Sequence, residues 1–380
     1  MITDIFNSRP LQAIGLLAGM TIGVGIFAIP FVFAQSGLAV GLIELAILLG
    51  VVILFNLMFA EIALRTKEQY RLPGYVGKYL GSPLRIVELA SYLAGFSGAL
   101  VAYLLVGGDF LGRLGGFDAR WGIATFVMLG GALMYSKFTV GARANYILTA
   151  LMALGIAALS VAALRFFHIS NLSRGSLSNA FVPYGVLLFA LTGAAIIPDI
   201  VFFLTNVNDR ESVKRVVVWG TIIPAAIYAL FAISMLGALD GEVSRESLSS
   251  VSALFGSGIG ALSLAVGVLT TFTSFTLFGF VFERMLRSDF GIGRTAAWLI
   301  TIVLPLILIF VGVSDYIKVI GLIGAVAVAV DGVMIIFMHR AAQQRGEITP
   351  PFSVRVAPAI EILLIVMFVA GVAYEFLHAV

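Results

Sequence analysis

The chain has 380 residues, of which 61% are hydrophobic and 11% are charged, and its mean hydropathy is +1.09. Soluble domains carry roughly 25% charged residues, so this composition excludes an ordinary soluble fold and indicates an integral membrane protein. The net charge of +3 is small and the basic residues are spread over loops, which fits contact with lipid headgroups and does not suggest nucleic-acid binding. The absence of cysteine excludes disulfides and thiolate metal sites.

A helix needs about 20 apolar residues to cross a bilayer core. The chain has eleven apolar segments of about this length, separated by short polar loops such as 65–85 and 240–250, so we expect a single transmembrane domain over residues 1–380. The segments are too long and too uniformly apolar for membrane β-strands, and the expected fold class is all-α. The predicted spans are 10–36, 38–64, 84–111, 121–137, 141–166, 181–206, 213–238, 256–285, 294–312, 316–338 and 356–377.

The first span contains GMTIGVGIFAIPFVFAQSG at 19–37, with four glycines and a proline. Inside a helix, glycine costs up to about 1 kcal/mol against alanine and proline about 3 kcal/mol. The sixth span contains FALTGAAIIPDIVFF at 189–203, and both spans share the spacing G-x-x-x-I-P, starting at Gly25 and at Gly193. Glycine in either span alone could serve helix packing. Spans one and six are five spans apart, an odd number, so the two copies cross the membrane in opposite directions, which predicts an inverted-repeat transporter with discontinuous helices.

An unwound stretch inside the membrane leaves backbone N–H and C=O groups that must meet a ligand or water. The N-terminus of a half-helix suits a carboxylate, whereas unwound carbonyls suit an ammonium group or a sodium ion. A zwitterionic amino acid matches both kinds of group. The predicted breaks therefore favour an amino acid as the substrate.

Three motifs resemble those of a known family: G-x-x-I-G-x-G-I-F-x-I-P-[FY]-x-F-A-Q-S-G in span one, F-A-[LY]-x-G-x-x-x-I-P in span six and T-S-F in span eight. They are similar to the amino acid/auxin permease family, especially its bacterial aromatic amino acid permease branch, within the amino acid–polyamine–organocation superfamily. The resemblance implies the LeuT fold, with a 5+5 inverted repeat over about 10–167 and 180–338 and an additional helix at about 356–377.

The resemblance also implies a substrate site made mostly of backbone. The carboxylate would meet the N–H groups of Val24 and Gly25, with Gly23 allowing the tight turn. The amine would meet carbonyls of Thr21 and of the span-six break. The substrate-binding residues implied are Thr21, Gly23, Val24, Gly25, Ile26, Phe189, Ala190, Thr192, Gly193 and Ala194.

Span eight carries Thr270, Thr273 and Ser274 at spacing i, i+3 and i+4, which places three hydroxyls on one helical face. Such hydroxyls can coordinate a cation, although they also commonly bond the backbone of their own helix. The resemblance adds the carbonyls of Gly19 and Ile22 to complete a sodium site. Some proton-coupled relatives place a span-five lysine there; this chain has none in span five, which favours sodium.

Acidic residues within or near spans are candidates for proton binding or gating. Asp199 follows Pro198 in span six, where it could sense a substrate gate or pair with a loop arginine. Asp331 lies in span ten among apolar residues, and Glu44 lies in span two, where it could be a buried interhelical partner.

Placing the N-terminus in the cytoplasm puts 17 of the 23 lysines and arginines on the cytoplasmic side, so by the positive-inside rule the C-terminus is outside and the location is the plasma or inner membrane. No cluster of catalytic groups or metal ligands is evident, and we expect neither enzymatic activity nor a cofactor, apart from Na⁺ as a coupling ion. The sequence predicts a secondary transporter for neutral, apolar or aromatic amino acids, with sodium favoured. The alternatives are proton coupling, or a non-transporting sensor or channel on the same fold. The expected partners are the amino acid and membrane lipids.

Overall fold

A computed structural model describes residues 8–136, 142–173, 175–239 and 243–378. These residues form helices and connecting loops, and the described ranges contain no β-strand. The helices are α2 (Arg9–Thr21), α3 (Gly25–Ser36), α4 (Leu38–Arg65), α5 (Leu72–Leu80), α6 (Ser82–Gly115), α7 (Ala119–Tyr135), α8 (Ala142–Ala163), α9 (Pro183–Leu191), α10 (Ile197–Asn206), α11 (Val213–Ala238), α12 (Leu248–Ser288), α13 (Arg294–Phe310), α14 (Tyr316–Leu322), α15 (Val328–Arg345) and α16 (Pro358–His378).

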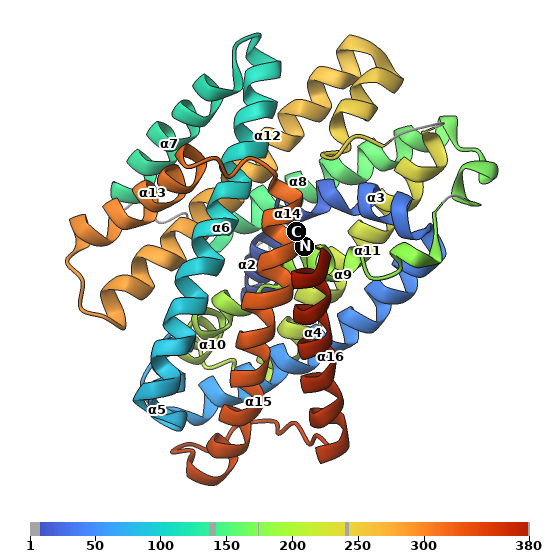
Figure 1. Ribbon diagram of the computed structural model, residues 1–380. Helices are drawn as coiled ribbons and strands as arrows, with labels where there is room; N and C mark the ends of the chain where they lie inside the picture. The colour runs from blue at the N-terminus through green and yellow to red at the C-terminus, as the bar shows by residue number, and fades with distance from the viewer. Residues whose placement is uncertain (1–7, 137–141, 174, 240–242, 379–380) are drawn as a thin grey trace.

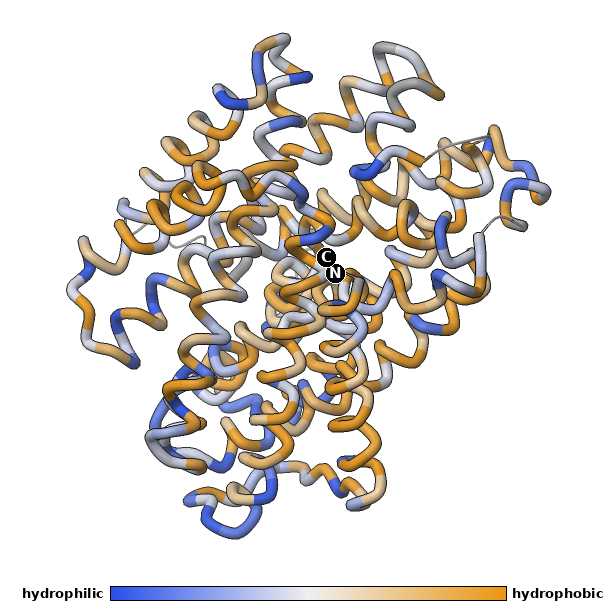
Figure 2. Tube along the Cα trace, in the orientation of Figure 1, coloured by the Kyte–Doolittle hydropathy of each residue, from blue (hydrophilic) through white to orange (hydrophobic). Residues whose placement is uncertain are grey.

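Eight helices in the described ranges are long and apolar enough to cross a membrane, and the bent pair α2 and α3 makes a ninth span. Figure 2 shows hydrophobic residues along most helices and hydrophilic ones concentrated in the loops. The all-helical, multi-pass class expected from composition is therefore confirmed. Helices α7 and α13 have only 17 residues each and occupy the positions of the fourth and ninth predicted spans. The expected boundaries at 137 and 141 lie outside the described residues.

The first span is discontinuous, as its glycines indicate. Helix α2 ends at Thr21, Ile22 has extended backbone angles (φ −76°, ψ 101°), and α3 starts at Gly25 after a bend of 56°. Pro30 lies inside α3. The break therefore precedes the proline by a full turn and coincides with the glycines.

The sixth span is discontinuous as well. Helix α9 ends at Leu191, Thr192 is extended (φ −75°, ψ 122°), and a short 3₁₀ turn, η4 (Ala194–Ile196), leads into α10. Pro198 lies in the first turn of α10, where its missing N–H costs no helical hydrogen bond. Both breaks predicted from the shared spacing are thus present.

Two regions differ from the expected loops. The segment 65–85 contains α5, which buries Leu72, Tyr75, Val76 and Tyr79 on one face. Their i, i+3, i+4, i+7 spacing is that of an amphipathic helix. The polar residues around them led to the segment being predicted as a loop. The segment 240–250 also ends in helix, because α12 starts at Leu248 and is kinked at Gly256, whose φ of 77° suits glycine.

The tenth span is interrupted by one π-helical stretch, η6 (Ile323–Ala327), between α14 and α15. π-helical turns are rare and frequently mark functional sites. Helix α2 packs against α8 and α11, α6 packs against α12 and α7, and η6 packs against α9. Figure 1 shows α16 along the outside of α15, and α7 beside α13 at one flank of the bundle.

Candidate functional site

The two breaks lie against each other in the middle of the bundle. A Cβ atom added at Gly25 would be 2.7 Å from the Cβ of Ala190, and one added at Gly193 would be 2.6 Å from Oγ1 of Thr21. Real Cβ atoms do not approach this closely, so both positions need glycine for the backbones to meet. The shared glycines therefore serve contact between the breaks as well as the unwinding itself.

Tyr228 of α11 connects the two breaks. Its hydroxyl oxygen lies 2.7 Å from the carbonyl oxygen of Thr21 and 2.8 Å from that of Ala190. A hydroxyl has one hydrogen and can donate it fully to only one of these acceptors. Tyr228 is 0% exposed, so the junction holds more acceptors than donors and is suited to a group with several N–H bonds.

The start of α3 provides donors on the opposite side of the break. The first N–H groups of a helix have no intrahelical partner, and here they include those of Gly25 and Ile26, after Val24 at the N-cap. The macrodipole adds positive potential at this end. The first break thus offers N–H groups from α3 and carbonyls from the end of α2.

Tyr103 of α6 reaches the same break. A Cβ added at Gly23 would lie 2.3 Å from its hydroxyl oxygen, and Tyr103 also hydrogen-bonds the side chain of Ser274. Ser274 in turn donates to the carbonyl of Ile22 at 3.0 Å. These contacts join α6, α12 and the first break through polar groups.

The rest of the hydroxyl stripe on α12 is arranged differently. Thr270 donates to Val266 at 2.7 Å and Thr273 to Leu269 at 2.8 Å, both on their own helix. Only Ser274 crosses to the first span, while Gly19 is buried within α2. The structure brings Ser274 and the Ile22 carbonyl together and leaves the two threonines bonded to backbone.

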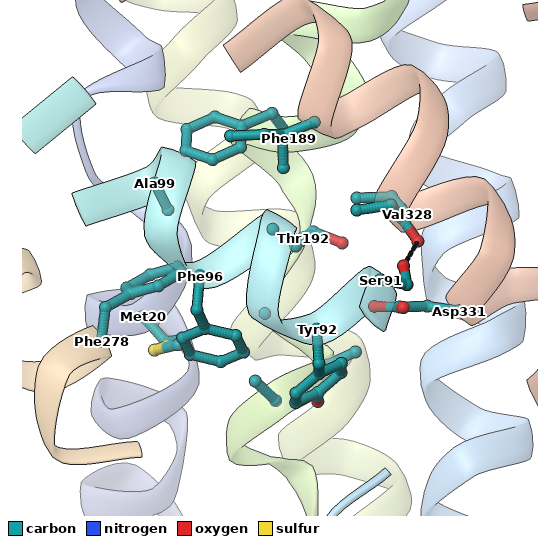
Figure 3. A pocket seen from close by; sticks show the side chains of 16 residues that line it. Met20, Ser91, Tyr92, Phe96, Ala99, Phe189, Thr192, Phe278, Val328 and Asp331 are labelled. Atoms are coloured by element: carbon teal, nitrogen blue, oxygen red, sulfur yellow. Dashed lines mark hydrogen bonds between the residues drawn. The ribbon is translucent and has the colours of Figure 1, made fainter. Parts of the chain in front are cut away.

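A cavity of about 40 Å³ adjoins the second break (Figure 3). Phe189, Thr192, Gly193 and Ala194, four of the expected substrate residues, line it, whereas Ile26 is buried elsewhere. Ala195 of η4 lines it as well, and the other walls come from α2, α6, α12 and the tenth span: Met20, Ser91, Tyr92, Gly95, Phe96, Ala99, Phe278, Ile323, Ala327, Val328 and Asp331. Asp331, expected from sequence only as a membrane carboxylate, thus contacts the same cavity as the break.

A larger cleft, of about 590 Å³, is lined by residues of α2, α7, α8, α10, α12 and α13. Leu16, Ile196, Leu148 and Thr273 line it, together with the arginines at the end of the bundle that was predicted to be cytoplasmic. Thr273 therefore faces this cleft from α12. The opening reaches from the hydroxyl stripe towards that end of the molecule.

Asp199 lies at the mouth of this cleft. It pairs with Arg71, which precedes α5, and with Arg284 of α12, 2.8 Å away, and Gln69 is a further neighbour. The pairing with a loop arginine matches one of the two roles considered from the sequence. Because Asp199 is on α10 and Arg284 on α12, the pair also connects the two walls of the cleft. Glu44 lies on α4 and lines neither the cavity nor the cleft.

Sequence reasoning missed Tyr103, Tyr228 and Glu88, which lie on α6 and α11 in otherwise apolar surroundings. It also missed a pair between Glu61 of α4 and His339 of α15, 2.9 Å apart. A single polar residue in a transmembrane helix is the only signal that could have identified each of them.

Comparison with known proteins places the chain among amino acid transporters. Residues 7–377 match the model of the tryptophan/tyrosine permease family. Glutamine transporter 2 of Aliivibrio fischeri is 19% identical over 326 residues, covering 82% of this chain and 84% of that protein.

Two solved structures share the fold. MhsT in complex with L-phenylalanine aligns with a TM-score of 0.66 and 17% identity, over 97% of this chain and 98% of that one. Mhp1, a nucleobase-cation-symport-1 family transporter in a closed conformation with bromovinylhydantoin bound, aligns with a TM-score of 0.61 and 16% identity, over 97% and 90%. Identities this low establish the architecture alone.

Proposed function

Because the chain belongs to the tryptophan/tyrosine permease family, within the superfamily of LeuT-fold amino acid transporters, we propose that it is an ion-coupled secondary transporter of neutral, apolar or aromatic amino acids. A permease moves its substrate without covalent chemistry, so the protein is a transporter and not an enzyme. The observation that carries the proposal is the contact between the two breaks, which brings helix-start N–H groups and two carbonyl acceptors that share one hydroxyl donor to one junction.

In this proposal the substrate carboxylate binds the N–H groups of Val24 and Gly25, beside Gly23 and Tyr103. The ammonium group binds the carbonyls of Thr21 and Ala190, where Tyr228 now lies between them. Its three N–H bonds would satisfy both carbonyls and the lone pair of the tyrosine hydroxyl. A zwitterion therefore completes a junction that one hydroxyl cannot satisfy.

The side chain of the substrate enters the cavity beside Phe189 and Thr192. Its walls are mainly apolar and include Phe96 and Phe278, which favours apolar or aromatic side chains. At about 40 Å³ the cavity is far below the roughly 300 Å³ of a typical ligand pocket. Binding an aromatic side chain therefore requires these phenylalanines to move apart.

For the topology we propose eleven spans, with α7 and α13 as the fourth and ninth. Spans one to five (about 10–167) and six to ten (about 180–338) form inverted repeats of one domain, and α16 is an additional helix. The breaks in spans one and six occupy matching positions, as such repeats require. The N-terminus lies in the cytoplasm and the C-terminus outside the cell membrane, with lipid as the surrounding partner.

Sodium is the favoured coupling ion. Its ligands would be the carbonyls of Gly19 and Ile22 and the hydroxyl stripe of α12, with Ser274 already in contact with Ile22. Thr270 and Thr273 would turn their hydroxyls from backbone to the ion. Because the ion would tie the first break to α12, ion and substrate would each raise the affinity for the other.

The difference between the two ends of the bundle supports alternating access. At one end Ser247 donates to the carbonyl of Phe27 at 2.7 Å, and the ring of Phe27 packs edge-on against Phe110. At the other end α2, α10 and α12 line the 590 Å³ cleft. We infer that this conformation is open towards the cytoplasm and that the reverse arrangement completes the cycle.

The test is uptake of labelled amino acids into proteoliposomes under an inward sodium gradient, an inward proton gradient or no gradient. We expect accumulation of aromatic or apolar amino acids under the sodium gradient. Accumulation under the proton gradient alone would mean that the coupling ion is the proton and not sodium. Flux without accumulation under any gradient would indicate a channel, and binding without flux would indicate a sensor.

A further inference from the structure

Two buried carboxyl groups face each other between α6 and α15. Glu88 is 0% exposed, and its carboxyl lies within hydrogen-bonding distance of that of Asp331. In the described part of the chain, no donor contacts either oxygen of Glu88 or Oδ1 of Asp331. Each carboxyl therefore has the other as its polar neighbour.

The surrounding charges do not neutralise this pair. Tyr92 on α6 faces both carboxyls, and beyond it lie Arg71 and Asp289. Arg71 is itself engaged with Asp199. Other basic residues of α5 and α15 have partners of their own: Lys78 pairs with Glu347, Arg340 pairs with Glu361, and the ring of His339 hydrogen-bonds Glu61.

Two adjacent carboxylates in a low-dielectric interior repel each other and lack solvation, so they do not both ionise. Retaining one proton between them gives a donor for the bond that joins them and leaves a single negative charge. A cation could also serve, but Arg71, which lies beyond Tyr92, is engaged with Asp199. The arrangement of Glu88 and Asp331 is that of a pair sharing one proton.

The pair borders the part of the molecule that must move. Asp331 lines the cavity together with Thr192 of the second break, and Figure 3 shows it beside Ser91. Ser91 donates to the carbonyl of Ala327 at 3.4 Å, at the end of η6. A Cβ added at Gly324 of η6 would lie 1.8 Å from the carbonyl oxygen of Gly185 in α9. This close packing joins α9 to η6, next to the carboxyl pair.

We propose that Glu88 and Asp331 form a proton-binding site that holds one shared proton and couples proton binding to occupancy of the adjacent cavity. This site is separate from the hydroxyl stripe on α12 that is proposed to bind sodium, and its role rests on the proposed transport function. Loss of the shared proton leaves two charges that push α6 and α15 apart and disturb the cavity wall. Substrate and proton therefore favour each other's binding.

The first test needs no substrate. Infrared difference spectra of the purified protein at neutral pH, wild type minus Glu88→Gln, should contain the C=O band of a protonated carboxylic acid. Asp331→Asn should remove the same band, whereas Asp109→Asn, on α6 but paired with Arg113, should leave it. A spectrum with only carboxylate bands at this pair would overturn the proposal.

The second test measures the pH dependence of L-tryptophan binding at constant sodium. With one proton linked to one substrate, the apparent Kd should rise by up to about tenfold per pH unit once the shared proton is lost. Glu88→Gln and Asp331→Asn should each bind with a flat profile, and Asp109→Asn should follow the wild type.

A flat wild-type profile, or the same slope in wild type and both variants, would refute the coupling. Absence of L-tryptophan binding at every pH would contradict the proposed substrate class, while the infrared result would still decide whether the proton is shared. If Asp331→Asn does not fold, Glu88→Gln alone provides both measurements.

Discussion

The hydroxyl of Tyr228 offers the sharpest test of the proposed ammonium site. It lies between the carbonyl oxygens of Thr21 and Ala190, at 2.7 and 2.8 Å, and the side chain is fully buried. Tyr228→Phe removes this group and keeps the ring. Because no solvent reaches the junction, water cannot replace the hydroxyl without rearrangement.

The expected loss follows from the hydrogen bonds involved. Leaving a buried acceptor unsatisfied costs about 1–3 kcal/mol, and 1.4 kcal/mol corresponds to a tenfold change in affinity. In the proposed complex the ammonium group binds both carbonyls and the Tyr228 oxygen, so the variant loses one of three acceptors for a charged donor. We expect affinity for an amino acid to fall by about tenfold or more.

The assay is equilibrium binding of labelled L-phenylalanine to purified protein, with 3-phenylpropionate, which lacks the amine, as a competitor. The variant should weaken binding of L-phenylalanine and leave the affinity for the competitor unchanged. Tyr184→Phe is the matched control, because Tyr184 is a buried tyrosine whose hydroxyl donates to Met367 outside the junction. Unchanged or tighter L-phenylalanine binding in Tyr228→Phe would show that the hydroxyl is a competitor of the amine and would refute this assignment.

Three further substitutions test other parts of the site. Gly25→Leu should abolish amino acid binding because the added side chain overlaps the sixth-span break, whereas Gly50→Leu, where an added Cβ has no neighbour within 4 Å, should bind normally. Ser274→Ala should remove most of the sodium dependence of uptake, measured as initial rate against sodium concentration. Asp199→Asn should leave the buried Arg71 without its partner, lowering stability by about 3 kcal/mol in thermal unfolding, and should increase labelling of a single cysteine introduced into the cleft of this cysteine-free chain.

Each of these substitutions has a contrary outcome that matters. Equal binding by Gly25→Leu and Gly50→Leu would show that the first break is not part of the substrate site. A sodium response in Ser274→Ala identical to that of the wild type would show that the hydroxyl stripe on α12 is not the sodium site. Unchanged cysteine labelling in Asp199→Asn would mean that its ion pairs do not hold the walls of the cleft together.

The breaks could be predicted because their cause is local. Glycine and proline at Gly25, Pro30, Gly193 and Pro198 disfavour a regular helix wherever they occur, and the repeated spacing distinguishes the two segments from ordinary packing glycines. Even so, the sequence did not show that the glycines also permit the breaks to touch. That contact depends on how α3 and α9 pack, which no single segment encodes.

The positions of the polar groups around the breaks depend on tertiary packing more than the breaks themselves do. Tyr103, Tyr228 and Glu88 are isolated in apolar helices, and hydrophobic periodicity has little power to orient a helix that is apolar on every side. Which face of α6 or α11 points to the breaks is fixed only by the whole bundle. The same limit explains the hydroxyl stripe, where Ser274 reaches Ile22 while Thr270 and Thr273 bond their own helix.

The contacts at the two ends of the bundle differ in chemistry, and this difference bears on the proposed cycle. The end near Phe27 is closed by packed aromatic rings and a buried hydrogen bond from Ser247. At the other end, Asp199 pairs with the buried Arg71, and its bridge to α12 is the pair with the exposed Arg284. Exposed ion pairs contribute only about 0–1 kcal/mol. Opening therefore costs less at the charged end, where the cleft is found. Reversal would need a ligand whose binding compensates for exposing the apolar end, and an ion and an amino acid that join the first break to α12 and α9 would provide that compensation.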